Sequence, residues 1–238
     1  MKDILSQKTD EELKEIYLLQ TFAKNESWFV PYFKKMKDVV LDSGAFTFMS
    51  GGKTKMTWDE YVEKYAYFIK KVGVKHFIEL DIDSIVGYEE VKRLRKKLVS
   101  LTNAQPIPVW HKTRGRDEFL HMCDEFSYVA LGGFAIKNWK RKDYKFIPWF
   151  INEAHKRNSE IHGLGFTNTT KLDTFRFDSV DSSTWTMGNR IGVAYKFDGK
   201  RIHLITRPDG TRVANRQLLA QHNFDEWLKF QQYAEEVL

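Results

Sequence analysis

The chain has 238 residues, about the length of one (β/α) barrel, and its 42% hydrophobic content can supply a buried core. Its formal net charge of +6 is compatible with a polyanionic partner, because lysine and arginine displace the counterions that condense along phosphates. A single cysteine, Cys123, excludes an intrachain disulfide and a thiolate-rich zinc cluster. Because the sequence has no apolar run of about 20 residues and no secretory signal, we expect a cytoplasmic protein without a membrane partner.

The N-terminal segment has helical periodicity. Thr9 precedes an acidic stretch, and Leu13, Ile16, Leu19 and Phe22 follow at helical spacing. This pattern predicts a packing helix from Thr9 through Phe22.

After this segment, short apolar runs alternate with amphipathic segments of helical periodicity. Such alternation is typical of parallel strands joined by crossover helices, so the sequence predicts an α/β fold. Because six strands with crossovers are visible where a complete barrel has eight, we expect a TIM-type (β/α) barrel that is irregular or incomplete. The predicted strands begin at Asp38, His76, Pro106, Ser127, Glu160 and Asp178, and the predicted helices span residues 57–73, 88–101, 116–126, 142–158 and 169–176.

The C-terminal region departs from this alternation. Residues 192–210 contain two alternating runs joined by Asp198-Gly199, which predicts a β-hairpin, and residues 224–238 have the pattern of an amphipathic helix. No linker or internal repeat divides the chain. We therefore expect a single domain, 1–238, with a barrel core at about 38–190 and a C-terminal hairpin and helix at about 191–238.

Polar residues and glycines gather where the predicted strands end. In parallel α/β architectures these ends carry the site, because the strands converge there and leave a cavity. Carboxylates that share a partly dry cavity repel one another, so at least one would titrate high enough for acid-base or nucleophilic work. Alternatively, each aspartate begins a turn or caps a helix, and the glycines only relieve steric crowding. The residues concerned are Asp42, Ser43, Gly44, Asp81, Asp83, His111, Lys112, Gly132, Gly133, Gly163, Gly165, Asp181, Ser182 and Ser183.

A metal site is a second interpretation of the same strand ends. His111 and His162, with Asp81, Asp83 and Asp181, offer the imidazole and carboxylate ligands that suit Zn²⁺ or Mn²⁺. No HxH or HExxH pair supports such a site, and hydrogen-bonding or core-edge histidines are the alternative.

Four segments, in chain order, resemble motifs of the tRNA-guanine transglycosylases, the enzymes that exchange guanine for a 7-deazaguanine base. LDSGAFTFMSGG, from Leu41, resembles the family's aspartate-serine-glycine-glycine motif. IELDIDS, from Ile78, resembles its aspartate-bearing second motif, and YVALGGF, from Tyr128, resembles its alanine-leucine-glycine-glycine motif. HGLGFTNTTKLDTFRFDSVDSS, from His162, resembles the glycine-rich strand, short helix and aspartate strand that end the family's core. The shared order makes this match more specific than any one motif.

The resemblance implies catalytic roles for two aspartates. In that family, a strand-end aspartate attacks ribose C1′ to form a covalent glycosyl enzyme, and a second aspartate transfers the proton of the departing or entering base. By motif, Asp181 would be the nucleophile and Asp42 the general acid/base, with Asp178 as the alternative nucleophile if the alignment slips. A carboxylate nucleophile suits a glycosidic carbon because it splits the displacement into two steps.

The resemblance also implies a site for a guanine-like base and no cofactor. Asp81 would accept hydrogen bonds from N1 and the exocyclic amine of the base, with Asp83 as the alternative if the register slips. Gly132 and Gly133 would bring backbone groups against the ring. The same substrate site would include Ser43, Gly44, His111 and Gly165.

The sequence also departs from the family. The family's cysteine-rich zinc subdomain, which helps to dock tRNA, is absent because only Cys123 exists, and the tail after Asp181 is short. The glutamine that follows the aromatic of the first motif is Thr47 here. These departures favour DNA over tRNA as the acceptor, as in compact phage and phage-derived relatives, and a phage-encoded protein would act in the host cytoplasm. A duplex base would have to be flipped out of its stack.

Positive side chains give weaker signals for nucleic acid. Arg190, Lys196 and Lys200 would hold phosphates beside the cavity, while the basic runs 92–98 and 137–145 either grip phosphates or form solvated helix faces. Three alternatives to base exchange stay open: a metal-dependent barrel hydrolase, an N-glycoside hydrolase in which water intercepts the covalent intermediate, and a non-catalytic nucleic-acid or nucleoside-binding relative. The oligomeric state is not predicted.

Overall fold

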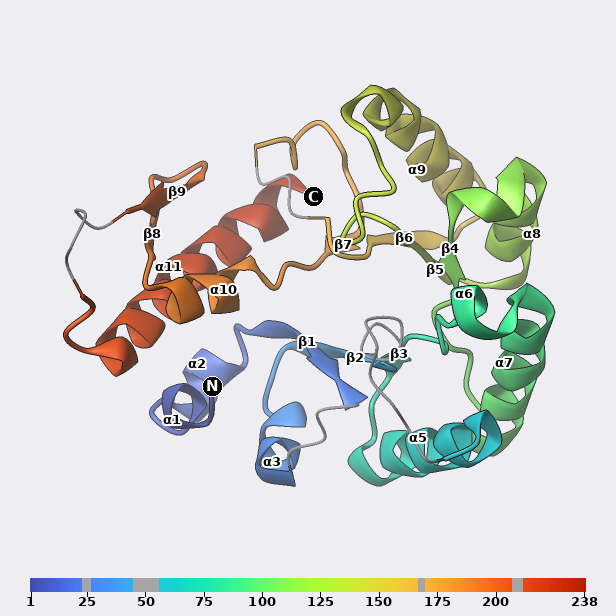
Figure 1. Ribbon diagram of the computed structural model, residues 1–238, viewed down its shortest axis with the longest axis horizontal. Helices are drawn as coiled ribbons and strands as arrows, with labels where there is room; N and C mark the ends of the chain where they lie inside the picture. The colour runs from blue at the N-terminus through green and yellow to red at the C-terminus, as the bar shows by residue number, and fades with distance from the viewer. Residues whose placement is uncertain (23–26, 45–55, 167–169, 207–211) are drawn as a thin grey trace. The chain divides into compact units, whose positions relative to one another are not determined.

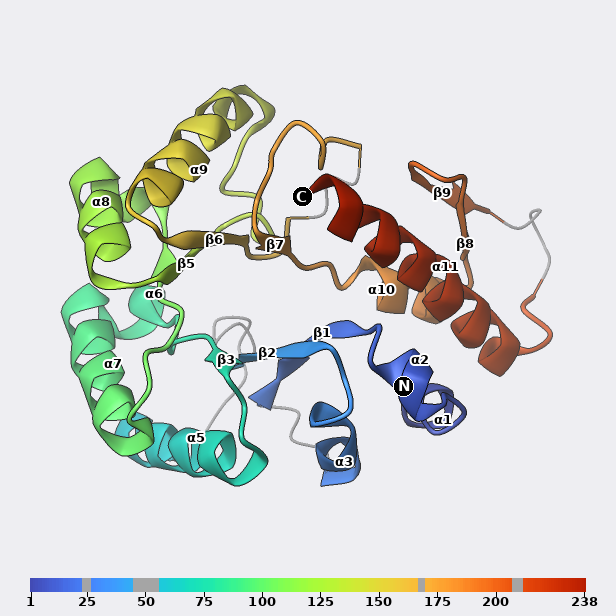
Figure 2. The same ribbon diagram turned by 180° about the vertical axis from the view of Figure 1, so that it is seen from behind.

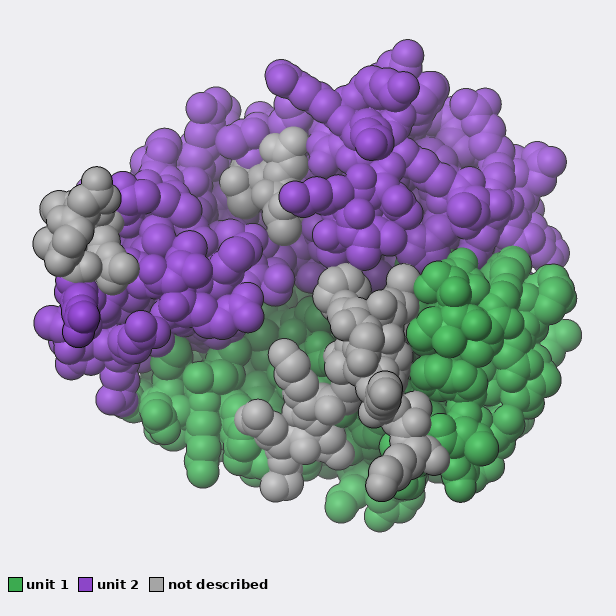
Figure 3. Space-filling model, viewed as in Figure 1, with its two compact units in different colours: residues 1–109 green, residues 110–238 purple. Residues whose placement is uncertain are grey.

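The computed structural model describes residues 1–22, 27–44, 56–166, 170–206 and 212–238 (Figure 1). The chain divides into two compact units, unit 1 (Met1–Val109) and unit 2 (Trp110–Leu238), which Figure 3 distinguishes by colour. Parallel strand pairs occur in both units, so the protein has an α/β fold. The expected single domain, 1–238, stays a prediction.

A three-stranded parallel sheet, in the order β1-β2-β3, organises unit 1. Its strands are β1 (Tyr17–Thr21), β2 (Asp38–Asp42) and β3 (His76–Phe77). β1 and β2 pair over their whole length, from Tyr17 opposite Asp38 to Thr21 opposite Asp42. The other described elements of this unit are α1 (Lys2–Leu5), α2 (Asp10–Leu13), the 3₁₀ helix η2 (Ser27–Phe29), α3 (Val30–Phe33), α5 (Trp58–Val72), α6 (Asp83–Val86) and α7 (Tyr88–Thr102).

The segment predicted as one helix from Thr9 through Phe22 forms a short helix and then a strand. Thr9 caps α2 in a capping box with Glu12, but the helix ends at Leu13. The following residues become β1 because β2 offers them backbone hydrogen bonds along the whole strand. The prediction was wrong because tertiary pairing overrides a weak local periodicity.

The two long helices of unit 1 confirm the predictions made from their spacing and termini. α5 begins after Thr57, which forms a capping box with Glu60, and ends at Gly73 in the left-handed conformation (φ 75°). α7 forms where predicted and packs against α5. Their position matters for the site because α5 presents two buried tyrosines, Tyr61 and Tyr65, to the end of β2.

A second sheet, in the order β4-β5-β6-β7, organises unit 2, and β5, β6 and β7 pair in parallel. α8 and α9 lie side by side along β5 and β6 in the views of Figure 1 and Figure 2. The strands are β4 (Val109–Trp110), at which the two units divide, β5 (Tyr128–Leu131), β6 (Glu160–Gly163) and β7 (Ser179–Val180). The helical elements before β7 are η3 (Lys112–Arg114), α8 (Gly115–Glu125), η4 (Arg141–Phe146) and α9 (Ile147–Lys156).

The two faces of this sheet differ in chemistry. Val129, Leu131 and Ile161 belong to the hydrophobic core of unit 2. Because successive side chains of a strand point to opposite faces, the residues that alternate with them lie on the other face. His162 and Ser179 are paired directly opposite each other there. One face is therefore a packed core, and the other carries polar side chains.

Each of the six predicted strand runs contains a strand, but the intervening segments differ in part from prediction. The segment 142–158 divides into η4 and α9 rather than forming one helix. The helix expected at 169–176 is wrong for its described part, where the chain makes turns that bury Leu172 and Phe175. These two side chains reach the core from a turn, so their three-residue spacing did not require a helix. The helix α10 (Thr184–Ile191) was not predicted.

The predicted C-terminal hairpin and helix are confirmed. β8 (Ala194–Phe197) and β9 (Ile202–Ile205) pair antiparallel, and α11 (Arg216–Val237) begins before the predicted residue 224. Asn223 and Glu226 of α11 accept hydrogen bonds from backbone amides of β8, which joins the helix to the hairpin.

Within the described residues, the strands form these two sheets and the antiparallel pair β8-β9, and no closed sheet is present. The expected TIM-type barrel therefore stays a prediction. Among the described helices, none combines the length and apolar character that crossing a membrane requires.

Candidate active site

Asp181 lies immediately after β7, at the carboxyl end of the sheet in unit 2. Its Oδ1 atom accepts a hydrogen bond from the backbone amide of Gly165 at 2.5 Å and lies 3.2 Å from Nε2 of His162. The side chain is 20% exposed, and no donor among the described residues contacts its Oδ2 atom. One carboxylate oxygen is thus fixed by the protein, and the other is left to meet a ligand.

Glycines shape the turn that carries the amide bonded to Asp181. Gly165 has a left-handed backbone (φ +73°), and a Cβ there would approach the Cβ of Ala135 to 3.0 Å. A Cβ at Gly163 would come within 3.0 Å of Phe166 and 3.2 Å of Val180. The Gly-x-Gly pattern therefore has a steric cause in the protein itself, and a larger residue at Gly165 would displace the amide.

His162 is buried, at 2% exposure, and contacts two side chains of the neighbouring strand segment. Its Nδ1 atom lies 2.5 Å from the hydroxyl oxygen of Ser179, which lies 2.5 Å from the hydroxyl of Tyr128 on β5. Of the two interpretations offered for His162, a metal ligand or a hydrogen-bonding histidine, these contacts agree with the second, but its partners Ser179 and Tyr128 were not predicted. The spacing Ser179-x-Asp181, which places both side chains on one face of a strand, was the signal available.

Asp178 lies at the opposite, amino end of β7. Its Oδ2 atom accepts a hydrogen bond from the backbone amide of Ile161 at 2.7 Å and lies 2.9 Å from Nε2 of His155 on α9. Asp178 thereby connects the starts of two strands to a helix. Sites of parallel α/β proteins lie at the carboxyl ends of strands, so of these two aspartates only Asp181 has the expected position.

Gly132 and Gly133 follow β5. The amide of Gly132 donates to the carbonyl of Trp110 at 2.8 Å, and its carbonyl accepts the indole N–H of Trp139 at 2.9 Å. Gly133 has φ +91°, and its partly exposed backbone passes close to Asn138. Gly132 therefore serves the scaffold of unit 2, and the proposed contact of this pair with a base stays a prediction.

His111 and Lys112 follow β4 in unit 2. His111 is buried, whereas Lys112 pairs with Asp143 at 2.5 Å, donates to the carbonyl of Asn138 and lies over the ring of Trp139. The hydrogen bond from Lys112 lowers the pKa of the Asp143 carboxyl. Lys112 thus stabilises the loop after β5.

The single cysteine is not a competing nucleophile. Cys123 is buried in α8, and this burial raises the pKa of its thiol to about 12. The thiolate, which is the reactive form, is therefore disfavoured at neutral pH.

Asp42 is the last residue of β2 in unit 1, and the buried residues Ser43 and Gly44 follow it. Thr21, which is opposite Asp42 on β1, places its hydroxyl 3.5 Å from Oδ2 of the aspartate. The rest of the matching sequence segment, residues 45–52, lies outside the described residues. Asp42 thus lies at the carboxyl end of β2, as Asp181 lies at the carboxyl end of β7.

Two tyrosines of α5 fix the backbone around Asp42. Tyr61 donates to the carbonyl of Ser43 at 2.6 Å, and Tyr65 donates to the carbonyl of Leu41 at 2.8 Å. Burial and the negative charge of Asp42 raise the pKa of both phenols, so both hydroxyls stay protonated and remain donors. These two contacts could not be predicted from the sequence, because two tyrosines in a helix form no distinctive pattern.

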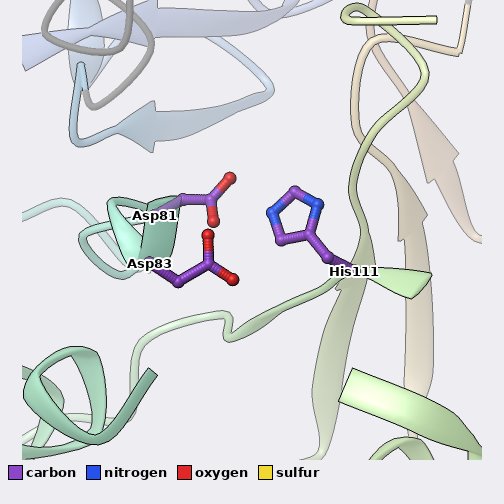
Figure 4. A group of neighbouring side chains, drawn as sticks. All are labelled: Asp81, Asp83 and His111. Carbon is purple, nitrogen blue, oxygen red and sulfur yellow. The ribbon is translucent and has the colours of Figure 1, made fainter. Parts of the chain in front are cut away.

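Asp81 and Asp83 follow β3 in unit 1, and Figure 4 shows both carboxylates extending from the segment that opens α6. Nearby Glu79 is fully buried, and its carboxylate accepts hydrogen bonds from Nε of Arg95 at 2.6 Å and from the amide of Val109 at 2.8 Å. Glu79 therefore has a structural role. Asp81 and Asp83, both partly exposed, offer oxygens of the kind that accept from a base amine or bind a divalent cation.

The three cations proposed for phosphate contacts differ in their surroundings. Arg190 on α10 and Lys196 on β8 are exposed, and neither pairs with an acidic side chain among the described residues. Lys200 lies 3.8 Å from a carboxylate oxygen of Asp173. Arg190 and Lys196 are therefore the better candidates for phosphate contacts.

The basic run 92–98 is largely paired within unit 1. Arg93 forms ion pairs with Asp59 and Glu90, and Lys97 forms ion pairs with Asp59 and Glu63. Hydrogen bonds from Arg93 and Lys97 lower the pKa of Asp59. This arrangement favours a solvated helix face over a phosphate-binding surface.

Comparisons with known proteins leave the family open. No protein-family model and no curated protein matches the sequence. Among solved structures, the chain is similar to "QR15, an Aldolase", with 12% sequence identity and a TM-score of 0.45, over 76% of this chain and 98% of that chain. At this identity and TM-score, the similarity supports no conclusion about activity.

Proposed function

We propose that this protein is a base-exchanging transglycosylase that replaces guanine in nucleic acid by a 7-deazaguanine base, with Asp181 as its nucleophile. The observation that carries the proposal is the asymmetry of the Asp181 carboxylate, whose Oδ1 is fixed while Oδ2 has no donor among the described residues. An oxygen oriented in this way at a strand end is suited to attack a sugar carbon. The ordered resemblance of four segments supplies the substrate class.

The reaction would proceed in two displacements. In the first, Oδ2 of Asp181 bonds to C1′ of the sugar while the bond from C1′ to N9 of guanine breaks and its electron pair leaves with the base. Asp42, as the general acid, gives the departing guanine a proton. In the second, N9 of the incoming 7-deazaguanine loses its proton to the carboxylate of Asp42, bonds to C1′ and displaces Asp181. Two displacements retain the anomeric configuration, and no cofactor is consumed.

Recognition of the base would rest on Asp81, or on Asp83 two residues later, with Gly133 facing the ring. A TIM-type barrel, whose sites lie at the carboxyl ends of its parallel strands, is the architecture that we propose.

The favoured acceptor is DNA, because these 238 residues contain one cysteine and so do not match the cysteine-rich subdomain with which the resembled family docks tRNA. Exposed Arg190 and Lys196 would contact phosphates, and the cost of flipping a base from a duplex is a few kcal/mol, least for a single-stranded or mismatched base. A mismatched or single-stranded guanine should therefore react faster than a paired one.

The test is incorporation of radiolabelled guanine and 7-deazaguanine bases into DNA and tRNA by the wild type, Asp181→Asn and Asp42→Asn. The proposal expects label in DNA with the wild type and none above background with either variant. Label in tRNA alone would correct the acceptor. Equal incorporation by the wild type and Asp181→Asn would reject the assigned nucleophile.

Other outcomes identify the alternatives. Release of guanine without incorporation, lost in Asp181→Asn, would indicate an N-glycoside hydrolase. Stoichiometric metal in the purified protein, with hydrolysis that a chelator abolishes, would indicate a metal-dependent hydrolase. Nucleic-acid binding that Asp181→Asn does not change, without release or exchange, would indicate a non-catalytic protein.

A further inference from the structure

A chain of hydrogen bonds leads to Asp181 through the polar face of the sheet in unit 2. Its groups are Tyr128, Ser179, His162 and Asp181, and the successive contacts measure 2.5, 2.5 and 3.2 Å. The strand register sets this order, because His162 on β6 is paired with Ser179 on β7, and Asp181 follows two residues later on the same face. Ala130, opposite His162 on β5, leaves the imidazole space between the strands.

With a neutral imidazole, this series of hydrogen bonds has one direction in which every donor has an acceptor. An ionised Asp181 can only accept hydrogen bonds, so Nε2 of His162 carries the ring hydrogen and donates to Oδ1. Nδ1 of a neutral imidazole then accepts from Ser179, and the oxygen of Ser179 accepts from the hydroxyl of Tyr128. In the other neutral tautomer, the lone pair of Nε2 would face the negative carboxylate, which is repulsive.

We infer that His162 is a positioning residue for Asp181 and that Ser179 and Tyr128 hold it as the Nε2–H tautomer. The inference rests on the proposed function for its effect on the reaction. With the amide of Gly165, the Nε2–H donor fixes the plane of the carboxylate and directs Oδ2 toward the sugar. Burial of His162 at 2% exposure keeps water from replacing either of its partners.

Two matched substitutions separate the two sides of the ring. Glutamine places its amide nitrogen near the position of Nε2, so His162→Gln keeps a donor for Asp181. Asparagine places its amide near the position of Nδ1, so His162→Asn keeps a partner only for Ser179. In single-turnover formation of the covalent DNA complex, we expect His162→Asn to be about 100-fold slower than the wild type and His162→Gln to recover most of that loss. KM for DNA should not change, and equal losses in two folded variants would overturn the inference.

A spectroscopic measurement tests the tautomer without depending on activity. Long-range ¹H–¹⁵N spectra of protein with labelled histidine would assign His162 by the signal that His162→Gln lacks. We expect Nε2–H in the wild type and a mixture of tautomers in Ser179→Ala. An Nδ1–H or doubly protonated His162 ring at neutral pH would overturn the inference. If the wild type transfers no base, the proposed function fails, and this spectrum still decides the inference.

Discussion

The two ends of β7 carry the same set of groups in different surroundings. Asp178 at the amino end and Asp181 at the carboxyl end each accept a backbone amide hydrogen bond and each lie beside Nε2 of a histidine. The histidine beside Asp178, His155, has a side chain that is 44% exposed, whereas that of His162 is 2% exposed. Strand end and burial, rather than residue type, therefore distinguish a structural carboxylate from a candidate nucleophile.

β2 repeats part of this contrast in unit 1. Asp38 at its amino end lies 2.7 Å from Nδ1 of His76 and accepts from the amide of Val39 at 2.8 Å. Asp42 at its carboxyl end is the residue that we propose as the general acid/base. We therefore expect substitutions at the carboxyl ends to remove activity and those at the amino ends to change stability slightly.

The largest expected effect separates Asp181 from Asp178. Asp181→Asn should lower the rate of base exchange by at least about 1,000-fold, because an amide cannot replace the carboxylate nucleophile. Asp178→Asn should keep the rate within a few-fold, since Asn Oδ1 can still accept from Ile161. Exchange rates and thermal melts of both variants make the comparison, and the reverse order of rates would assign the nucleophile to Asp178.

Replacing the glycine in the turn that supports Asp181 should cost more stability and activity than replacing a glycine with a positive φ elsewhere. Gly165→Ala adds a 3.0 Å contact with Ala135 to an unfavourable positive φ, so we expect a loss of about 2 kcal/mol in stability and a large loss of activity. Gly199→Ala, at φ +99° in the hairpin with no atom within 4 Å, should cost about 1 kcal/mol and leave the exchange rate unchanged. Denaturant unfolding gives both stabilities. A loss of activity in Gly199→Ala equal to that in Gly165→Ala would contradict this account.

A smaller effect is expected for the cations. Arg190→Gln and Lys196→Gln should each weaken DNA binding a few-fold and reduce the salt dependence of binding by about one counterion. Lys200→Gln is the matched control, because Lys200 already lies beside Asp173. Binding titrations at several salt concentrations measure the slope. An unchanged slope in both test variants would remove these residues from the proposed nucleic-acid contact.

The smallest effect concerns the amino end of β2 and depends on pH. Burial raises the pKa of Asp38. The hydrogen bond and the charge of His76, together with the hydrogen bond from the amide of Val39, outweigh the effect of burial, so the pKa of Asp38 is lowered. A lowered folded-state pKa contributes stability above the unfolded pKa of about 3.9, and this contribution is lost as the pH falls through the folded value. Asp38→Asn should therefore cost under about 1 kcal/mol at pH 7 and less near pH 3, because the pair is partly exposed. A larger cost at pH 3 than at pH 7 would reverse the assigned sign.

The sequence predicted the strand runs and the long helices because apolar periodicity and caps are local properties. Thr57 and Gly73, for example, mark both ends of α5 without reference to the rest of the chain. The strand β1 was not predicted, because its formation depends on pairing with β2, which only the folded chain provides.

The strand-end residues of the candidate site could be predicted from the sequence, but the residues that form hydrogen bonds with them could not. Asp181 and Gly165 were predicted from the motifs, but the hydrogen bond from the Gly165 amide to Asp181 depends on a turn with a positive φ, which favours glycine. For His162, a metal-ligand and a hydrogen-bonding interpretation were both open, because one histidine in a sequence does not reveal its two partners. Ser179 and Tyr128 became visible only through the strand register.

The most direct test of Asp181 as nucleophile is to trap the covalent intermediate. Wild-type protein would be mixed with guanine-containing DNA in the absence of an incoming base, quenched in acid, digested and mapped by mass spectrometry. We predict a nucleotide adduct on the peptide that contains Asp181, located at that side chain by fragmentation and absent in Asp181→Asn. An adduct at Asp178 or at another residue, or base exchange without any adduct on Asp181, would contradict this prediction.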